Sequence, residues 1–109
     1  MRAYELMVIF DGDETEADVQ KAVQRVSKLC TDGGATIATT DFWGRRKFAY
    51  EINHKLEGYY LVLELTAENG NFIEGVERQL LIADDVARHK FIRLPEKEAA
   101  RRGLVGAPS

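Results

Sequence analysis

The sequence predicts one α+β domain, in which two helices cover one face of a four-stranded antiparallel sheet and leave the other face open. Three observations support this fold class. Apolar residues alternate with a period of two in four segments, which is typical of strands. They recur at helical spacing in two further segments. The segments follow one another as strand, helix, strand, strand, helix, strand, and 109 residues can bury a single modest core.

The first strand is expected over residues 2–10 and the first helix over residues 14–32. Both alternating faces of the strand are apolar enough for a central position in a sheet. Asp13 is the expected N-cap of the helix, with Glu16 as its capping-box partner. The glycine pair at 33–34 ends the helix, because glycine adopts the left-handed backbone at little cost.

A long strand is expected over residues 35–52, which are rich in threonine, isoleucine and aromatic residues. Gly44 within it is a candidate for a bulge or kink, which leaves the faces of its neighbours open. Residues 53–58 are interpreted as a polar connection. The next strand follows over residues 59–66, with every second residue apolar.

The second helix is expected after a turn at 68–71, with Asn71 and Glu74 as its capping pair. Gly75 inside it costs about 1 kcal/mol of helix propensity relative to alanine. The last strand covers residues 86–94 and ends before Pro95. The domain is therefore expected over residues 1–95, and residues 96–109, which have little apolar content, are expected to form a tail that is mobile in isolation.

This order of elements is the split βαβ, or ferredoxin-like, arrangement (βαββαβ). Its uncovered sheet face is a ready binding surface. Many functions use this scaffold, so the function has to be argued from particular residues.

Composition excludes several classes of function. A net charge of −3 argues against a free-standing nucleic-acid binder. Cys30 cannot form an internal disulfide and lies on the apolar stripe of the first helix, as a buried small hydrophobe would. Neither a metal-ligand cluster nor a catalytic constellation is visible. We therefore expect no enzyme activity, no cofactor, no metal and no small-molecule substrate. With no signal peptide or membrane span evident, a soluble cytosolic protein is expected.

The charge is unevenly distributed along the chain. Residues 11–18 hold five acids, whereas the segment 41–53 interleaves three cations with aromatic residues. If Phe48 and Tyr50 turn toward the helices, Trp43, Arg45 and Lys47 face the open side. The alternative is a solvated edge strand whose cations discourage aggregation.

Two other places contribute candidate cations. Arg88, Lys90 and Arg93 lie in the last strand, where a solvated face is an equally good interpretation, and Arg2 begins the first strand. Cations interleaved with aromatic residues suit a surface that grips phosphates and packs against bases or a partner protein. The candidate phosphate-binding residues are Arg2, Arg45, Arg46, Lys47, Arg88, Lys90 and Arg93, and the candidate packing residues are Trp43 and Tyr50.

Other ferredoxin-like functions fit the residues poorly. An RNA-recognition motif needs a cation and stacking aromatic residues in its third strand, where this chain has Glu57 and Glu64. A metallochaperone needs paired cysteines in the first loop, and an acylphosphatase needs an arginine there. That loop, Asp11-Gly12-Asp13, has neither.

Four blocks of the sequence resemble the bacterial small-subunit ribosomal protein S6 family. They are the opening Met1–Met7, the block Trp43–Ile52, the pair of tyrosines with its Glu-Gly at 57–60, and the approach to the last strand at 80–86. The resemblance covers residues 1–94 in order, and the Gly-x-Arg-x-x-Ala-Tyr core is its most specific part. Phe48 departs from the usual leucine.

The resemblance implies the fold reached above and a structural ribosomal protein without catalytic activity. It implies pairing with ribosomal protein S18, and binding of the pair to the central domain of small-subunit ribosomal RNA during assembly. The candidate cations would then be RNA-binding residues, and Trp43 and Tyr50 would pack against the RNA or the partner. The partner could then supply much of the cationic surface that this acidic chain lacks. The remaining alternative is a ferredoxin-like regulatory or oligomerising module that binds a small anion or a protein through its open sheet face.

Overall fold

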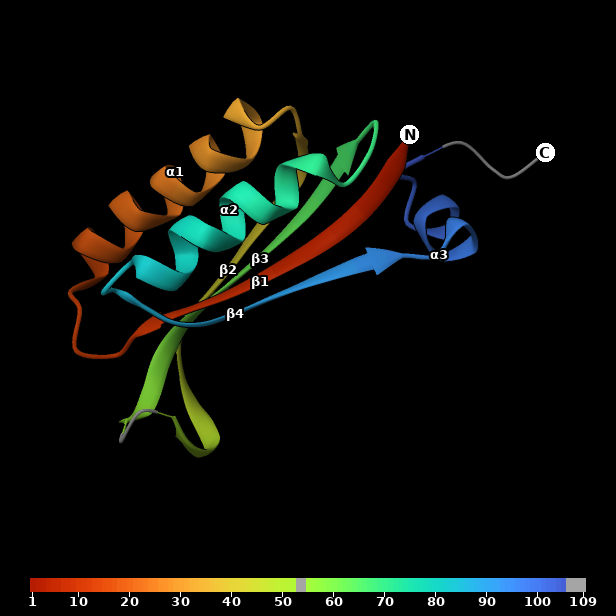
Figure 1. Ribbon diagram of the computed structural model, residues 1–109. Helices are drawn as coiled ribbons and strands as arrows, with labels where there is room; N and C mark the ends of the chain where they lie inside the picture. The colour runs from red at the N-terminus through yellow and green to blue at the C-terminus, as the bar shows by residue number, and fades with distance from the viewer. Residues whose placement is uncertain (53–54, 106–109) are drawn as a thin grey trace.

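The computed structural model describes residues 1–52 and 55–105 of the chain. Two long helices lie over one face of a twisted sheet, and a short third helix follows the last strand (Figure 1). The elements are β1 Arg2–Asp11, α1 Glu16–Asp32, β2 Thr36–Ile52, β3 Lys55–Ala67, α2 Asn71–Ile82, β4 Val86–Leu94 and α3 Glu96–Arg101.

The four strands form one sheet in the order β2-β3-β1-β4. β1 pairs antiparallel with both β3 and β4, and β2 pairs antiparallel with β3. This topology confirms the ferredoxin-like arrangement predicted from the order of the elements.

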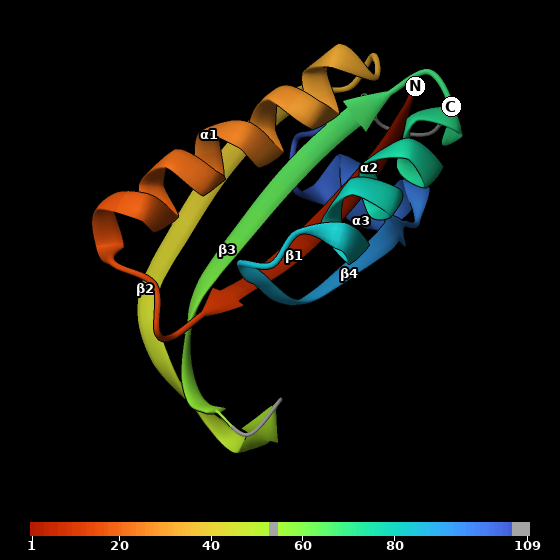
Figure 2. The same ribbon diagram turned by 60° about the vertical axis from the view of Figure 1, so that its left-hand side comes forward.

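The core lies between the sheet and the two long helices. Leu6 and Val8 of β1 and Leu61 and Leu63 of β3 are fully buried, and each is one member of an alternating row. Burying one such side chain contributes about 1.5–3 kcal/mol. α1 and α2 lie on the same side of the sheet and close this layer (Figure 2). The apolar stripes predicted for both helices are the faces that they bury.

The caps of both helices differ from the sequence prediction. Thr15, and not Asp13, is the N-cap of α1, and its hydroxyl accepts the backbone N–H of Asp18 at 3.2 Å. Gly70 precedes α2 and offers no side-chain cap. The predicted capping by Asn71 is therefore wrong, because Asn71 already lies within the helix.

β3 begins earlier than predicted, because the expected polar connection is largely strand. Residues 55–58 continue β3, and Arg46 and Lys47 of β2 pair with Gly58 and Glu57. The far parts of β2 and β3, residues 45–52 and 55–58, project beyond the helices as a hairpin arm (Figure 1). Polar residues are tolerated in this strand because no helix covers the arm.

The segment expected to be a mobile tail contains a helix. α3 places Ala99, which is 2% exposed, against Ala3 and Leu94 on the face of the sheet opposite α1 and α2. One small apolar side chain thus finds a buried place that composition did not indicate. Residues 106–109 lie outside the described residues.

Candidate nucleic-acid interface

A β-bulge in β2 determines which side chains reach the open face. Phe42 pairs with Leu61 and Gly44 with Tyr60, so Trp43 is an extra residue between two consecutive positions of β3. Gly44 has a φ of 78°, in the left-handed region that favours glycine. The bulge that the sequence indicated at Gly44 is therefore present, and it reverses the alternation of the residues that follow.

The reversed alternation corrects the predicted orientation of the cations. Arg45 pairs with Tyr59, a core residue, and so lies on the helix side of the sheet rather than the open side. Arg46 pairs with Gly58 and takes the open side. Lys47 pairs with Glu57 and lies on the same side as Arg45, so its predicted orientation is wrong too. Trp43 is on the open face as predicted, where it contacts Tyr60. The error came from counting straight through the bulge.

Trp43 is held rigidly on the open face. Its ring stacks on Tyr60 with centroids 5.6 Å apart and planes inclined by 4°. Its Nε1–H donates to Oδ2 of Asp41 at 2.9 Å, which fixes the rotation of the indole. The side chain nevertheless remains 42% exposed. The indole is therefore oriented in advance while much of its surface faces solvent.

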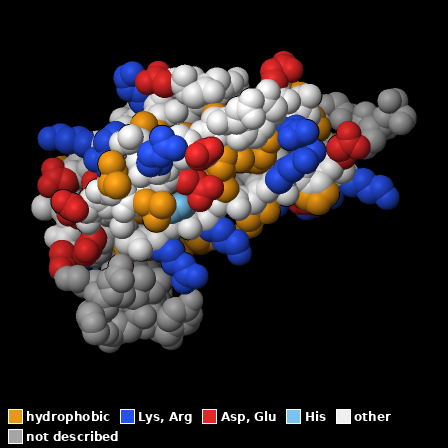
Figure 3. All heavy atoms as spheres, in the orientation of Figure 1, with side chains coloured by type: hydrophobic (Ala, Val, Ile, Leu, Met, Phe, Trp, Pro, Cys, Tyr) orange, Lys and Arg blue, Asp and Glu red, His pale blue; other side chains and the backbone are white. Residues whose placement is uncertain are grey.

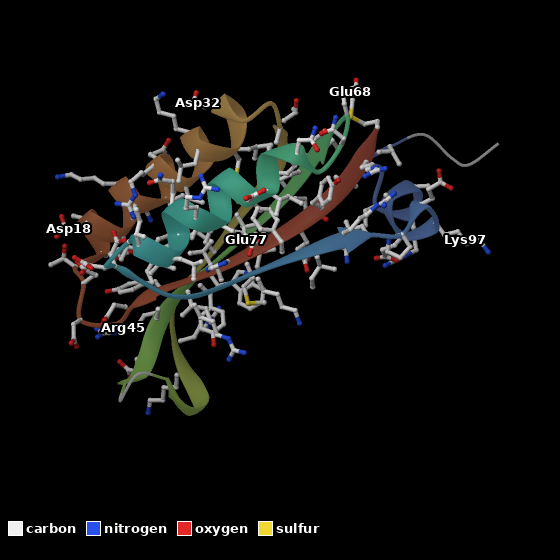
Figure 4. The ribbon with its side chains drawn as sticks, in the orientation of Figure 1. Asp18, Asp32, Arg45, Glu68, Glu77 and Lys97 are labelled. Carbon is white, nitrogen blue, oxygen red and sulfur yellow. The ribbon has the colours of Figure 1, made fainter. Side chains whose placement is uncertain are left out.

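Arg45 ties the hairpin arm to the body of the protein. Its Nε lies 3.0 Å from Oε2 of Glu57, and its guanidinium also donates to the carbonyl oxygen of Gly12. The same guanidinium lies 5.7 Å from the ring centroid of Tyr59. Arg45 is seen at the base of the arm in Figure 4. These contacts indicate a structural role for Arg45 beside the acidic turn that precedes α1.

The cations of β4 are divided between the two faces. Arg88 pairs with Ile9 and Lys90 with Met7, which places both on the open face. Arg93 pairs with Tyr4, a core residue, and so lies on the helix side. Two of the three β4 cations thus lie on the same face as Arg46, and Arg93 lies on the other.

Arg2 and Arg93 form a separate group at the far end of the sheet. They line one small pocket together with Glu68 and Glu96. Asp11, at the hairpin end of β1, lies nine positions after Arg2, which corresponds to about 30 Å. The expected cations therefore do not form one continuous surface.

The structure brings together a set of residues that we call the open-face strip. Its members share one row or adjacent rows across the sheet, near the hairpin arm. They are Trp43, Tyr60, Val62, Met7, Ile9, Arg46, Arg88 and Lys90. Sequence reasoning missed Tyr60, Met7, Ile9 and Val62 as neighbours of Trp43. The sequence did contain a signal for these neighbours, because both faces of β1 are apolar. A strand that is covered on one face only usually has polar residues on the other face.

The other end of the open face is covered by the C-terminal segment. Arg102 lies between Glu5 of β1, at 3.3 Å, and Glu64 of β3, at 3.1 Å, and also reaches Glu98 at 2.7 Å. Hydrogen bonds from Arg101 and Arg102 lower the pKa of Glu98 to about 2. The same contact with Glu98 raises the pKa of Arg102. We call this ion cluster the Arg102 clamp, and it lies over Glu5 and Glu64 on the open face, away from the hairpin arm.

Some predicted features lie elsewhere or outside the described residues. The side chain of Tyr50, expected to pack against RNA or partner, lies outside them, as does that of Phe48. Cys30 is fully buried, and burial raises the pKa of its thiol to about 11. Within the described part of the chain, no group of His, Cys, Asp and Glu could hold a metal, and no helix could cross a membrane.

The helix-covered side carries charges of both signs. Lys and Arg side chains alternate there with Asp and Glu side chains (Figure 3). Several of these form short-range ion pairs, such as Lys28 with Asp32 and Arg78 with Glu74. Because the signs are mixed, this side attracts a polyanion less strongly than the open-face strip does.

Comparison with known proteins assigns the chain to a family. The family model described as "Ribosomal protein S6" matches residues 3–93. The small ribosomal subunit protein bS6 of Arthrobacter sp. (strain FB24) is 42% identical over 98 residues, which are 90% of this chain and 95% of that protein. The bS6 protein of Leifsonia xyli subsp. xyli is 42% identical over 96 residues, covering 88% and 74% of the two chains.

A solved structure has the same architecture. The crystal structure of 30S ribosomal protein S6 from Thermotoga maritima superposes with a TM-score of 0.82 at 28% sequence identity. The match covers 94% of this chain and 95% of that one.

Proposed function

The chain belongs to the ribosomal protein S6 family, and from this premise we propose that it binds the central domain of small-subunit ribosomal RNA together with ribosomal protein S18 during assembly. Membership itself makes it a structural constituent of the small ribosomal subunit. RNA binding, a role in translation and a location on the ribosome follow from the family, which is structural rather than catalytic. In a bacterium that location is in the cytoplasm.

The observation that supports RNA binding is the concentration of exposed cations around the open-face strip of an acidic protein. Arg46 is exposed on the hairpin arm, and Arg88 and Lys90 are exposed on β4. Lys47 is exposed on the other side of the same arm. The whole chain nevertheless has a net charge of −3. These cations therefore give an anionic polymer a place to bind on a chain that is acidic overall.

The net charge also supports joint binding with a second protein. Few cations of this chain lie on any one face, so the chain alone can neutralise few RNA phosphates. A basic partner beside the open-face strip would extend the cationic surface. We propose that S18 supplies it.

Filter binding of the pair to the central RNA domain tests the proposal. The double change Arg46→Ala with Lys47→Ala should weaken retention by about tenfold or more, because phosphate contacts are lost. Arg45 is kept, since its contacts with Glu57 and Gly12 are structural. A charge-matched control changes Lys21 and Lys28 of α1 to alanine and should leave retention unchanged.

The outcomes separate the two classes of function. Equal retention by the Arg46/Lys47 variant and by the wild type would remove these cations from the mechanism. Retention by neither the protein nor the pair would contradict the proposal and favour a regulatory or oligomerising module.

A further inference from the structure

We propose that Trp43 is a base-stacking platform, on which an unpaired nucleotide of the ribosomal RNA stacks. The inference rests on the RNA binding proposed above and names the part of the RNA that this site takes. The site would bind the flat face of a nucleobase, in a nucleotide whose phosphates lie within reach of cations on the same face.

The contacts of the indole leave a ring face, and not its polar edge, for binding a ligand. Its polar edge is already satisfied, because Nε1–H donates to Asp41 at 2.9 Å. One ring face is stacked on Tyr60. The side chain is 42% exposed, and we assign the ligand to the opposite ring face. A base added there would continue a parallel stack that already exists in the free protein, with little loss of side-chain freedom on binding.

The cations nearest to Trp43 suit a nucleic acid. Arg46 lies on the same face two positions along β2 from Gly44, which is about 7 Å. Arg88 and Lys90 lie on the same face of β4, three strands away from β2, which is about 14 Å across the sheet. A nucleotide stacked on the indole would thus have Arg46 close to it along β2, with Arg88 and Lys90 farther away on the same face.

The strip is less suited to burying a protein. Of the large hydrophobic side chains exposed in the described part of the chain, those on this face are Trp43 and Ile92. Met7 and Val62 are already half-buried. A stable protein interface needs about 800 Å² on each side with an apolar centre. One exposed indole with cations on the same face is better suited to stacking with a nucleobase than to burying a protein surface.

The single tryptophan makes the inference directly testable. Trp43 is the sole tryptophan of the chain. Incorporation of 7-azatryptophan into this protein alone gives a probe that can be excited apart from any tryptophan of S18. We expect its emission to be quenched when the central RNA domain is added to the pair, and to stay unchanged when S18 is added without RNA.

Substitutions provide a second measurement. Trp43→Leu should lower the affinity of the pair for the RNA about fivefold or more, with the salt dependence unchanged, because stacking releases no counterions. Trp43→Phe should retain most of the affinity, since it keeps a ring. Ile92→Ala removes an exposed apolar side chain from the same face and serves as the matched control, with no expected loss.

The possible results are distinct from one another. RNA retention with unchanged emission, or full affinity in Trp43→Leu, would overturn the stacking while leaving the proposed function intact. Quenching by S18 alone would assign Trp43 to the protein interface. Absence of RNA retention in the wild-type pair would overturn both proposals. Urea unfolding of each variant identifies any that fails to fold.

Discussion

At Gly44, the conformation of one residue decides which side chains of β2 reach the open face. Its φ of 78° is the left-handed backbone, and a Cβ built there meets nothing within 4 Å. A substitution at this position therefore tests backbone strain without a steric clash. Glycine adopts this backbone without strain, and the bulge depends on it. The placement of Arg45 on the helix side depends in turn on the bulge.

We expect Gly44→Ala to lower the free energy of unfolding by about 1–2 kcal/mol, the cost of the left-handed backbone for a residue with a Cβ. The matched control is Gly75→Ala in α2, where a Cβ also meets nothing within 4 Å. There the change should raise stability by about 0.5–1 kcal/mol through helix propensity. Urea midpoints measure both. A Gly44→Ala midpoint equal to that of the wild type would show that the bulge does not require the left-handed backbone.

Arg45 and Arg46 show that adjacent cations can have different roles. Arg45 contacts Glu57, Gly12 and the ring of Tyr59, whereas Arg46 takes the open side and is exposed. Changing both at once would combine a loss of anchoring with a loss of binding. For that reason the binding test leaves Arg45 in place.

At the scale of elements, the sequence predicted those features that depend on periodicity. The period of two in β1 and the stripes of both long helices correspond to the buried rows of the structure. Periodicity could not count the extra residue at Trp43, because a slip of one residue reverses every face beyond it. Gly44 indicated the place of the bulge and not its effect.

α3 had no comparable local signal. A helix of six residues is not stable by its own propensity. It is held by Ala99 against Ala3 and Leu94, and by the Arg102 clamp on Glu5 and Glu64. These partners are distant in the sequence, so composition alone indicated a mobile tail.

The Arg102 clamp yields a prediction at this scale. Arg102→Ala should increase amide hydrogen exchange in α3 while the protection of β1 and β3 changes little, because the clamp holds one segment and not the core. Lys97→Ala is the control, since Lys97 also lies in α3 but makes none of the ion pairs of the clamp. Equal protection of α3 in wild type and Arg102→Ala would contradict this role.

The clamp should also respond to acid. The pKa of Glu98 is lowered from 4.5 to about 2 in the folded protein, chiefly by hydrogen bonds from Arg101 and Arg102. Its stabilising effect is therefore complete above pH 4.5 and lost as the pH falls toward 2. Protection factors of α3 amides should fall over that range. Glu98→Gln, which removes this carboxylate while Glu5 and Glu64 still face Arg102, should reduce the fall.

At the scale of the whole molecule, the position of the charges is expected to matter more than their sum. The acidic residues 11–18 lie at the same end of the sheet as the hairpin arm, because Asp11 pairs with Gly58. The division is thus between faces rather than between ends. Arg45 meets the acidic turn on the helix side, while Arg46, Arg88 and Lys90 point to the open side.

Two variants with equal net charge distinguish the effect of where the cations lie from the effect of the total charge. One changes Arg46, Arg88 and Lys90 to alanine, and the other changes Lys21, Lys28 and Arg78, so each removes three positive charges from a chain of net charge −3. The first should reduce the slope of log affinity against log salt by about 2–3 for the pair with S18, near one unit for each lost phosphate contact. The second should change it by less than about one unit, because its cations lie on α1 and α2, on the face of the sheet opposite the open-face strip. Filter binding of the central RNA domain at several salt concentrations measures both slopes. Equal slopes in the two variants would mean that only net charge governs the association, and that the open face has no special part in it.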